Sequence, residues 1–139
     1  MLLDHHFQVE IGGNFDTTFF SVGGLTLWRN IVETRYGSSK SGTPLIEPGE
    51  GHVNNIVLRR HLEKPQSDLY QWYIEQNYGV QARDVVIKLL NRNHEPVMSW
   101  LLRGCVPVRL SYSDLTADTA DPMVEEIELA VESAEVRFE

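Results

Sequence analysis

The side chains that most often carry metal binding are few and scattered in this sequence. The histidines are His5, His6, His52, His61 and His94. None falls in an H-x-x-x-H or H-E-x-x-H arrangement, the spacing that places two imidazoles on one helix face. His5 and His6 are adjacent, and adjacent side chains of a strand point to opposite faces. We therefore expect no metal site.

Nucleophilic and phosphate-binding motifs are also missing from the sequence. Cys105 is the only cysteine, and no base lies beside it in the chain. No G-x-S-x-G sequence is present. The glycine pairs at 12–13 and 23–24 are not followed by a helical pattern, so they do not form a phosphate cradle. We expect neither catalytic residues nor a cofactor, and hence no enzyme.

A cluster of carboxylates near the C-terminus is the remaining candidate for acid–base chemistry. It contains Glu125, Glu126 and Glu128. At this spacing a strand would present a charged face, with nothing in the sequence to raise one pKa above the others. We interpret these residues as an acidic surface rather than a catalytic pair.

The net charge of the 139-residue chain is −8, and its location is informative. Residues 114–139 contain nine acidic side chains and one basic side chain, whereas residues 1–113 contain eleven of each. This distribution argues against electrostatic capture of nucleic acid, which requires clustered Lys and Arg. One role for the acidic C-terminal segment is that of a solvated edge that aids solubility.

Length and hydropathy indicate a single domain over residues 1–139. No apolar run approaches the roughly 20 residues of a membrane span. The first residues lack the basic and apolar regions of a signal peptide. We expect synthesis in the cytoplasm and no stable membrane insertion.

Short apolar segments with turn residues between them predict a mainly β domain. The predicted strands are 6–11, 17–22, 25–34, 53–62, 85–90, 96–102 and 106–111. One helix is predicted at 67–76, because Leu69, Trp72 and Tyr73 share a face and Ser67 can cap the start. This pattern indicates a sandwich or small barrel.

Residues 37–51 are so rich in Gly, Ser and Pro that we predict a long loop without regular structure. Loops of this length are usually functional or disordered. Leu45 and Ile46 are unusual within it. They either dock onto another surface or fold back onto their own domain.

The acidic C-terminal segment allows two structures. Val124, Ile127 and Val131 have helical spacing, and Asp121 followed by Pro122 resembles a helix start. Alternation of apolar residues with glutamates instead suits a strand with an acidic face. The pattern by itself slightly favours the helix.

The order of several weak motifs resembles a known family. They are Val22-Gly23-Gly24-Leu25, Tyr36 and the glycine-rich loop, Pro48-Gly49, Ile56-Val57-Leu58-Arg59-Arg60, Trp72, Val85 to Leu90, Pro96 to Trp100, Val106-Pro107-Val108, Asp114-Leu115, and Glu125 to Ala130. Together, over about residues 6–132, they resemble the tail tube family of contractile phage tails and extracellular contractile injection systems.

The resemblance implies two packed antiparallel sheets forming a small barrel with one flanking α-helix, and a strand for the C-terminal segment. It implies a structural homo-oligomer, a hexameric ring that stacks into a hollow tube for cargo. Sheath, baseplate or spike, and tape-measure proteins would be its partners, in a virion or a released phage-tail-like particle. Nucleic acid would not be bound sequence-specifically.

Two groups of residues then become candidate sites. The oligomer interface would be the loop, with Tyr36, Thr43, Pro44, Leu45, Ile46, Glu47 and Pro48. The lumen face would contain Glu126, Glu128 and Glu132, whose alternative position is toward the sheath.

Departures from the family pattern suggest an alternative within the same machine. Arg60-His61 stands where the family usually has Arg-Gly, and Gly104-Cys105-Val106-Pro107 replaces an Asn-Ala-Trp-Pro-like run. These changes would suit a specialised baseplate-proximal subunit that initiates or caps the tube. An alternative from another class is a lone β-barrel that binds a small ligand, which would need an apolar pocket with converging polar groups.

Overall fold

The computed structural model describes residues 1–4, 6–35 and 42–139. In this part of the chain, strands dominate and one α-helix is present. The strands are β1 (Phe7–Ile11), β2 (Asn14–Asp16), β3 (Phe19–Gly23), β4 (Leu27–Thr34), β5 (Leu45–Val53), β6 (Ile56–His61), β7 (Arg83–Leu90), β8 (Pro96–Tyr112), β9 (Val124–Ala130) and β10 (Ser133–Phe138). The helix α1 (Asp68–Glu75) continues into the 3-10 turn η1 (Gln76–Tyr78).

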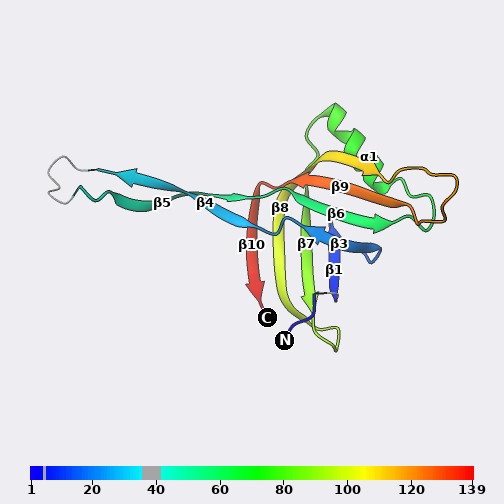
Figure 1. Ribbon diagram of the computed structural model, residues 1–139, viewed down its shortest axis with the longest axis horizontal. Helices are drawn as coiled ribbons and strands as arrows, with labels where there is room; N and C mark the ends of the chain where they lie inside the picture. Colours follow the sequence, from blue (N-terminus) through cyan, green and yellow to red (C-terminus); the bar gives the residue numbers. More distant parts are fainter. Residues whose placement is uncertain (5, 36–41) are drawn as a thin grey trace.

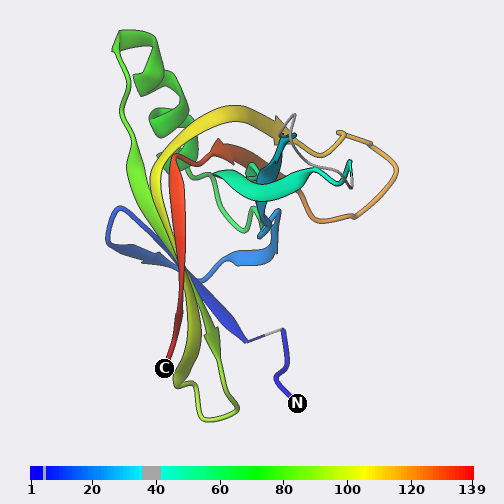
Figure 2. The same ribbon diagram turned by 90° about the vertical axis from the view of Figure 1, so that its left-hand side faces the viewer.

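The long strand β8 joins two layers of antiparallel strands. Its first part pairs with β7 and β10, and its second part, from Val106, pairs with β9. Gly104, with φ of 66°, lies between the two parts, where β8 arches over (Figure 2). We call β2, β1, β7, β10 and the start of β8 the first layer. The end of β8 with β9, β6 and β3 forms the second layer.

The mainly β architecture with two antiparallel layers and one short helix is confirmed. Within the described residues, the pairing follows the open order β2-β1-β7-β8-β9-β6-β3, and its end strands β2 and β3 do not pair with each other. No closed barrel is therefore seen in this part of the chain. Among the residues that the structure describes, the strands β4 and β5 pair only with one another.

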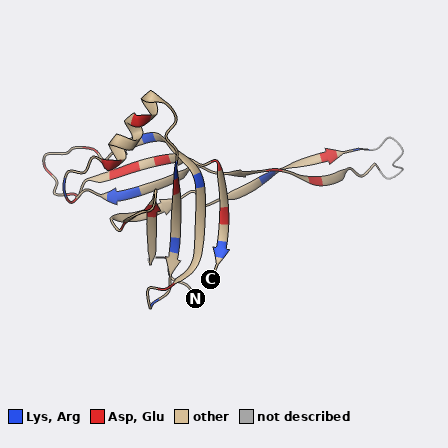
Figure 3. Cartoon of the chain, turned by 180° about the vertical axis from the view of Figure 1, so that it is seen from behind, with Lys and Arg blue, Asp and Glu red and all other residues tan. Residues whose placement is uncertain are grey.

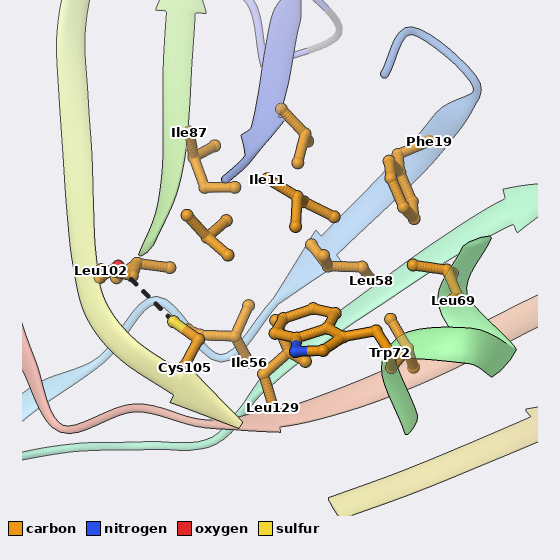
Figure 4. Packing of buried hydrophobic residues seen from close by; sticks show 13 residues of the cluster. Ile11, Phe19, Ile56, Leu58, Leu69, Trp72, Ile87, Leu102, Cys105 and Leu129 are labelled. Atoms are coloured by element: carbon orange, nitrogen blue, oxygen red, sulfur yellow. Dashed lines mark hydrogen bonds between the residues drawn. The ribbon is translucent and has the colours of Figure 1, made fainter. Parts of the chain in front are cut away.

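The core lies between the layers and beneath the helix (Figure 4). Val9 and Ile87 from the first layer face Leu58 and Ile127 from the second, and all four are buried. Trp72 of α1 is fully buried, and its indole N–H donates to the Gln81 carbonyl oxygen at 2.9 Å. The predicted helix is confirmed. The predicted cap is wrong, because the Ser67 side chain makes no capping hydrogen bond.

The prediction of an irregular loop at 37–51 is wrong for its second part, because Leu45–Val53 forms β5. Pairing with β4 satisfies the backbone despite the glycines and Pro48. At Gly49 an added Cβ would lie 2.7 Å from the Asn30 carbonyl oxygen, beside a register shift in the ribbon. Glycine is the residue that permits such a close approach at a bulge. Residues 37–41 lie outside the described part.

The C-terminal segment is a strand, as the family resemblance implied, and the helical alternative is wrong. Alternate residues of β9 point into the core, including Ile127 and Leu129. A buried partner for Glu125 makes this alternation possible, because Arg60 lies directly opposite it on β6. The final strand β10, which follows a two-residue connection, was not predicted.

Candidate functional site

The pair β4 and β5, here called the arm, projects away from both layers as a two-stranded ribbon (Figure 1). Six of its large apolar side chains have exposed fractions between 45% and 66%. They are Leu27, Trp28, Ile31, Val32, Leu45 and Ile46. A hairpin of only two strands is marginally stable in water. We therefore expect the arm to gain stability from another surface.

The glycine pair at the end of β3 sets the direction in which the arm leaves the body. Gly24 has φ of 90°, and a Cβ at this position would overlap the Asn55 carbonyl oxygen. A hydrogen bond joins the two chain segments at the base of the arm, where the Asn54 N–H donates to the Thr26 carbonyl oxygen at 3.1 Å. Only glycine combines this φ with so close an approach. The Val22-Gly23-Gly24-Leu25 motif thus forms the root of the arm.

The outer half of the arm carries apolar side chains on both faces, because cross-strand partners share a face. The first arm face carries Ile31, Glu33, Ile46 and Pro48, and the second arm face carries Val32, Thr34, Leu45 and Glu47. Ile31 and Ile46 are the most exposed of these aliphatics, at 66% and 61%. A ribbon with aliphatics on both faces has no side suited to bulk water.

The residues predicted for the oligomer interface gather on the arm, with one exception. Thr43 and Pro44 immediately precede β5, and Leu45, Ile46, Glu47 and Pro48 begin it. Tyr36 lies outside the described residues. Leu45 and Ile46 are 45% and 61% exposed, so the alternative in which they fold back onto their own domain is wrong.

The predicted lumen residues occupy two different places. Glu126 and Glu128 lie on the outward face of β9, whereas Glu132 is in the connection to β10. Glu126 is within 2.7 Å of the Arg59 guanidinium and 3.7 Å of that of Arg109. Charges of both signs therefore alternate across this face (Figure 3), and it is less acidic than the sequence pattern indicated.

A buried ion cluster around Arg60 was not predicted from the sequence. The Arg60 guanidinium is fully buried and donates to Glu125 at 2.7 Å, to Asp16 at 2.9 Å and to Asp68 at 2.6 Å. These carboxylates come from β9, β2 and α1. The cluster thus fixes the helix and the end of β2 to the second layer.

Hydrogen bonds within this cluster shift the ionisation of its members. The hydrogen bond from Arg60 holds the pKa of Asp68 below its usual value. The Tyr112 hydroxyl donates to Glu125 at 2.7 Å, and burial together with this bond raises the pKa of Tyr112 to about 12. The sequence did contain a sign that this pair is buried. Arg60 and Glu125 lie two residues from Leu58 and Ile127, at positions of their strands that point into the core.

Metal-binding and nucleophilic side chains are the remaining candidates for chemistry among the described residues. Three or more His, Cys, Asp or Glu side chains do not come together in a metal-binding group in this part of the chain. Cys105 is buried, and burial raises the pKa of its thiol to about 12. None of the described helices is long and apolar enough to cross a membrane.

Besides the exposed arm, the described structure has strand edges whose backbone groups lack a neighbouring strand. β10 pairs with β8 on one side, and β3 pairs with β6 on one side. Neither has a second strand partner among the described residues. Unpaired edges present rows of N–H and C=O groups to which another chain can add.

Comparisons with known proteins identify a matching family. The family model described as T4-like virus tail tube protein gp19 matches residues 3–135. None of the curated protein sequences matches the chain.

Three solved structures illustrate the likeness of the fold. A chain of the PVC sheath-tube complex, an extracellular contractile injection system in its extended state, is 25% identical, with a TM-score of 0.84 and coverage of 100% of this chain and 93% of that one. A chain of the anti-feeding prophage cap, described as the tube terminating cap, is 22% identical, with a TM-score of 0.85 and coverage of 100% and 92%. A chain of the six-fold symmetrised anti-feeding prophage baseplate is 24% identical, with a TM-score of 0.83 and coverage of 99% and 96%.

The family match over almost the whole length of the chain leads to one conclusion. This chain belongs to the T4-like virus tail tube protein gp19 family.

Proposed function

We propose that six copies of this tail tube subunit close into a ring, and that rings stack into the hollow inner tube of a contractile injection system. The family is a structural component of such tubes. The six-fold symmetry of the anti-feeding prophage baseplate, which contains a chain of the same fold, supports the ring size. Closed rotational symmetry is also the usual arrangement of soluble homo-oligomers.

The observation that carries the proposal is the unsupported arm. Its apolar side chains contact little of their own body, so the isolated chain leaves a large apolar ribbon in water. Contact with a neighbouring copy would bury this surface. We therefore assign Thr43, Pro44, Leu45, Ile46, Glu47 and Pro48 to the contact between rings.

The open edges of the sheet supply the contacts within a ring. A neighbour that adds its strands to β10 or β3 would pair backbone groups left open in the described chain. Such additions would also continue the two layers into a barrel-like wall. The small barrel expected from the family resemblance belongs to this assembled state.

The position of the bore relative to β9 is part of the proposal. We expect Glu126, Glu128 and Glu132 to border it, where negative charge reduces adhesion of acidic cargo. Arg59 and Arg109 partly offset this charge. A cryo-EM map of the assembled tube would test this expectation, and an outer-wall position for the three glutamates would contradict it.

The complete particle supplies the remaining partners. We expect the outer surface of the tube to contact a sheath and its end to rest on a baseplate or spike. Tape-measure protein and cargo would occupy the lumen. Assembly would follow synthesis in the cytoplasm and end in a virion or a released extracellular particle.

A substitution pair tests the role of the arm. The double variant Ile31→Asp/Ile46→Asp places charge on the first arm face, and Leu115→Asp adds charge at a loop position that is 84% exposed. We expect tubes from the wild type and Leu115→Asp, and folded protein without tubes from the arm variant. Negative-stain microscopy and circular dichroism provide the two readouts. Normal tubes from the arm variant would contradict the proposed role.

The length of the polymer separates the main tube subunit from the alternative of a capping or initiating subunit. A main subunit with a free arm continues to add rings, so purified protein should form tubes of many rings. Single rings that never stack, at any protein concentration, would favour the cap or initiator.

A further inference from the structure

Two histidines from distant parts of the chain meet at one end of the first layer. His6 immediately precedes β1, and His94 belongs to the turn between β7 and β8. The centres of their imidazole rings are 5.7 Å apart, and the ring planes are inclined by 48°. Figures 1 and 2 both show the N-terminal segment beside this turn. Spacing along the sequence did not indicate the pair, because only the fold brings the two residues together.

The separation of the two rings matches that of two ligands on one metal ion. Zn²⁺ binds histidine nitrogen at about 2.0–2.1 Å and prefers a tetrahedral arrangement. Because a ring nitrogen lies roughly 1 Å from its ring centre, two imidazoles on the same ion have centres roughly 5–6 Å apart. The other ring contacts of histidine are closer stacks, at 4.4 Å between Trp28 and His52 and 4.3 Å between Phe20 and His61.

Backbone hydrogen bonds hold both histidines in position. The Leu90 N–H donates to the His6 carbonyl oxygen at 2.7 Å, which fixes the N-terminal segment to the end of β7. The His94 N–H donates to the Asn91 carbonyl oxygen at 3.0 Å. The Asn91 side chain also accepts two backbone N–H groups of the turn, at 2.8 and 3.0 Å. Ligands that are held in place before binding lose little conformational freedom when the ion arrives.

The backbone of His94 adopts a conformation that favours glycine. Its φ is 60°, the only positive value at a non-glycine residue in the described part of the chain. Glycine would adopt this φ without strain. Residues held in such conformations are found most often at ligand sites and other functional positions. The imidazole of His94 is thus retained at some cost to the stability of the turn.

We propose that His6 and His94 bind a transition-metal ion, for which Zn²⁺ is the representative. Imidazole suits Zn²⁺, Cu²⁺ and Ni²⁺. Three or more His, Cys, Asp or Glu side chains do not gather in a metal-binding group within the described ranges, so water completes the coordination and the ion exchanges readily. The other charges of the turn offset each other, since Arg92 and Glu95 are both exposed. The ion ties the N-terminal segment to the turn. This site goes beyond the tube function and does not depend on it.

Zinc titration of the purified full-length chain tests the proposal. We would titrate ZnCl₂ into metal-free wild type, His94→Gly and His6→Gln, with His61→Gln as the matched control. Removal of a residue that only orients a metal ligand weakens affinity about 10- to 100-fold. We therefore expect at least about a tenfold loss of zinc affinity from His94→Gly and from His6→Gln, and no loss from His61→Gln. MgCl₂ should not compete, because Mg²⁺ prefers oxygen ligands.

Two further measurements separate metal binding from a structural contact between the rings. Zinc should raise the melting temperature of wild type and His61→Gln but not that of His94→Gly, which without metal should be at least as stable as wild type because glycine suits its φ. X-ray absorption of the zinc-loaded wild type should show two imidazoles on the ion. Equal zinc affinity in all four proteins, or one imidazole in that spectrum, would mean that the two rings only pack together and would overturn the proposal.

Discussion

Arg60 and Glu125 lie directly opposite each other on β6 and β9, and neither side chain is exposed to solvent. Two further carboxylates, from Asp16 and Asp68, share the same guanidinium. One buried cation therefore connects two strands of the second layer with α1 and β2. Because a buried charge without a partner is costly, this cluster favours one arrangement of helix and strands.

Loss of the buried cation should destabilise the fold strongly. We expect Arg60→Met to lower the free energy of unfolding by about 3–5 kcal/mol, because the buried Glu125 carboxyl group would be left without its cationic partner. The matched control is Arg59→Met, one position along the strand, where the side chain is 46% exposed. Its cost should be below about 1 kcal/mol. Urea unfolding at neutral pH measures both, and equal costs would contradict the role of the cluster.

The contribution of Asp68 to stability should depend on pH. Since Arg60 lowers the pKa of Asp68 in the folded state from its ordinary value of 3.8, the stabilisation is complete above that value and is lost as the pH falls through the folded pKa. Asp68→Asn should therefore destabilise the protein at pH 7 and have a smaller effect near pH 2.

Urea unfolding of both proteins at the two pH values checks this expectation. Asp114→Asn, in the exposed connection between β8 and β9, is the control and should show little effect at either pH. An effect of Asp68→Asn that stays constant or grows on acidification would contradict the linkage.

The root of the arm should tolerate a side chain at only one of its two glycines. Gly24→Ala combines a positive φ with overlap on the Asn55 carbonyl oxygen, so we expect a loss of at least about 1–3 kcal/mol. A Cβ at Gly23 meets no atom within 4 Å, so Gly23→Ala should stay within about 0.5 kcal/mol of the wild type. Thermal unfolding compares the two, and a benign Gly24→Ala would show that the chain can leave β3 by another route.

The thiol of Cys105 should report unfolding. It is buried, and its pKa is raised to about 12, so the reactive thiolate is scarce in the folded protein. We expect its reaction with a disulfide reagent at pH 8 to be at least about a hundredfold slower than in urea-unfolded protein. Fast labelling of the folded chain would show that the bend of β8 opens locally.

The periodic strands and the aromatic helix could be predicted from the sequence, because local patterns specify them. Phe7, Val9 and Ile11 alternate with polar residues, and Leu69 and Trp72 have helical spacing. Pairing between strands is not local, which explains the error at β5 and the slight preference of the pattern for a helix at β9. Pro48, Gly49 and Gly51 resemble loop residues until β4 lies beside them. Glu125 resembles a surface residue until Arg60 lies opposite it.

The candidate site, too, could be predicted from the sequence only in part. The sequence singled out the segment now proposed for the interface, through Leu45 and Ile46 among turn residues, and the order of its motifs indicated a resemblance to the tail tube family. The ion cluster around Arg60 could not be predicted, since it joins residues that are far apart in the chain.

The sequence by itself determined the strand-rich character, the position of the helix and the acidic C-terminal part of this protein, because periodicity and composition are properties of neighbouring residues. The order of its motifs carried the resemblance to the tail tube family. Only the tertiary structure decided that residues 45–53 form a projecting strand, that Glu126 is paired with arginines, and that Arg60 is buried among three carboxylates. Those features depend on which strands meet, and cross-strand pairing and burial of charge become defined only when distant segments pack together.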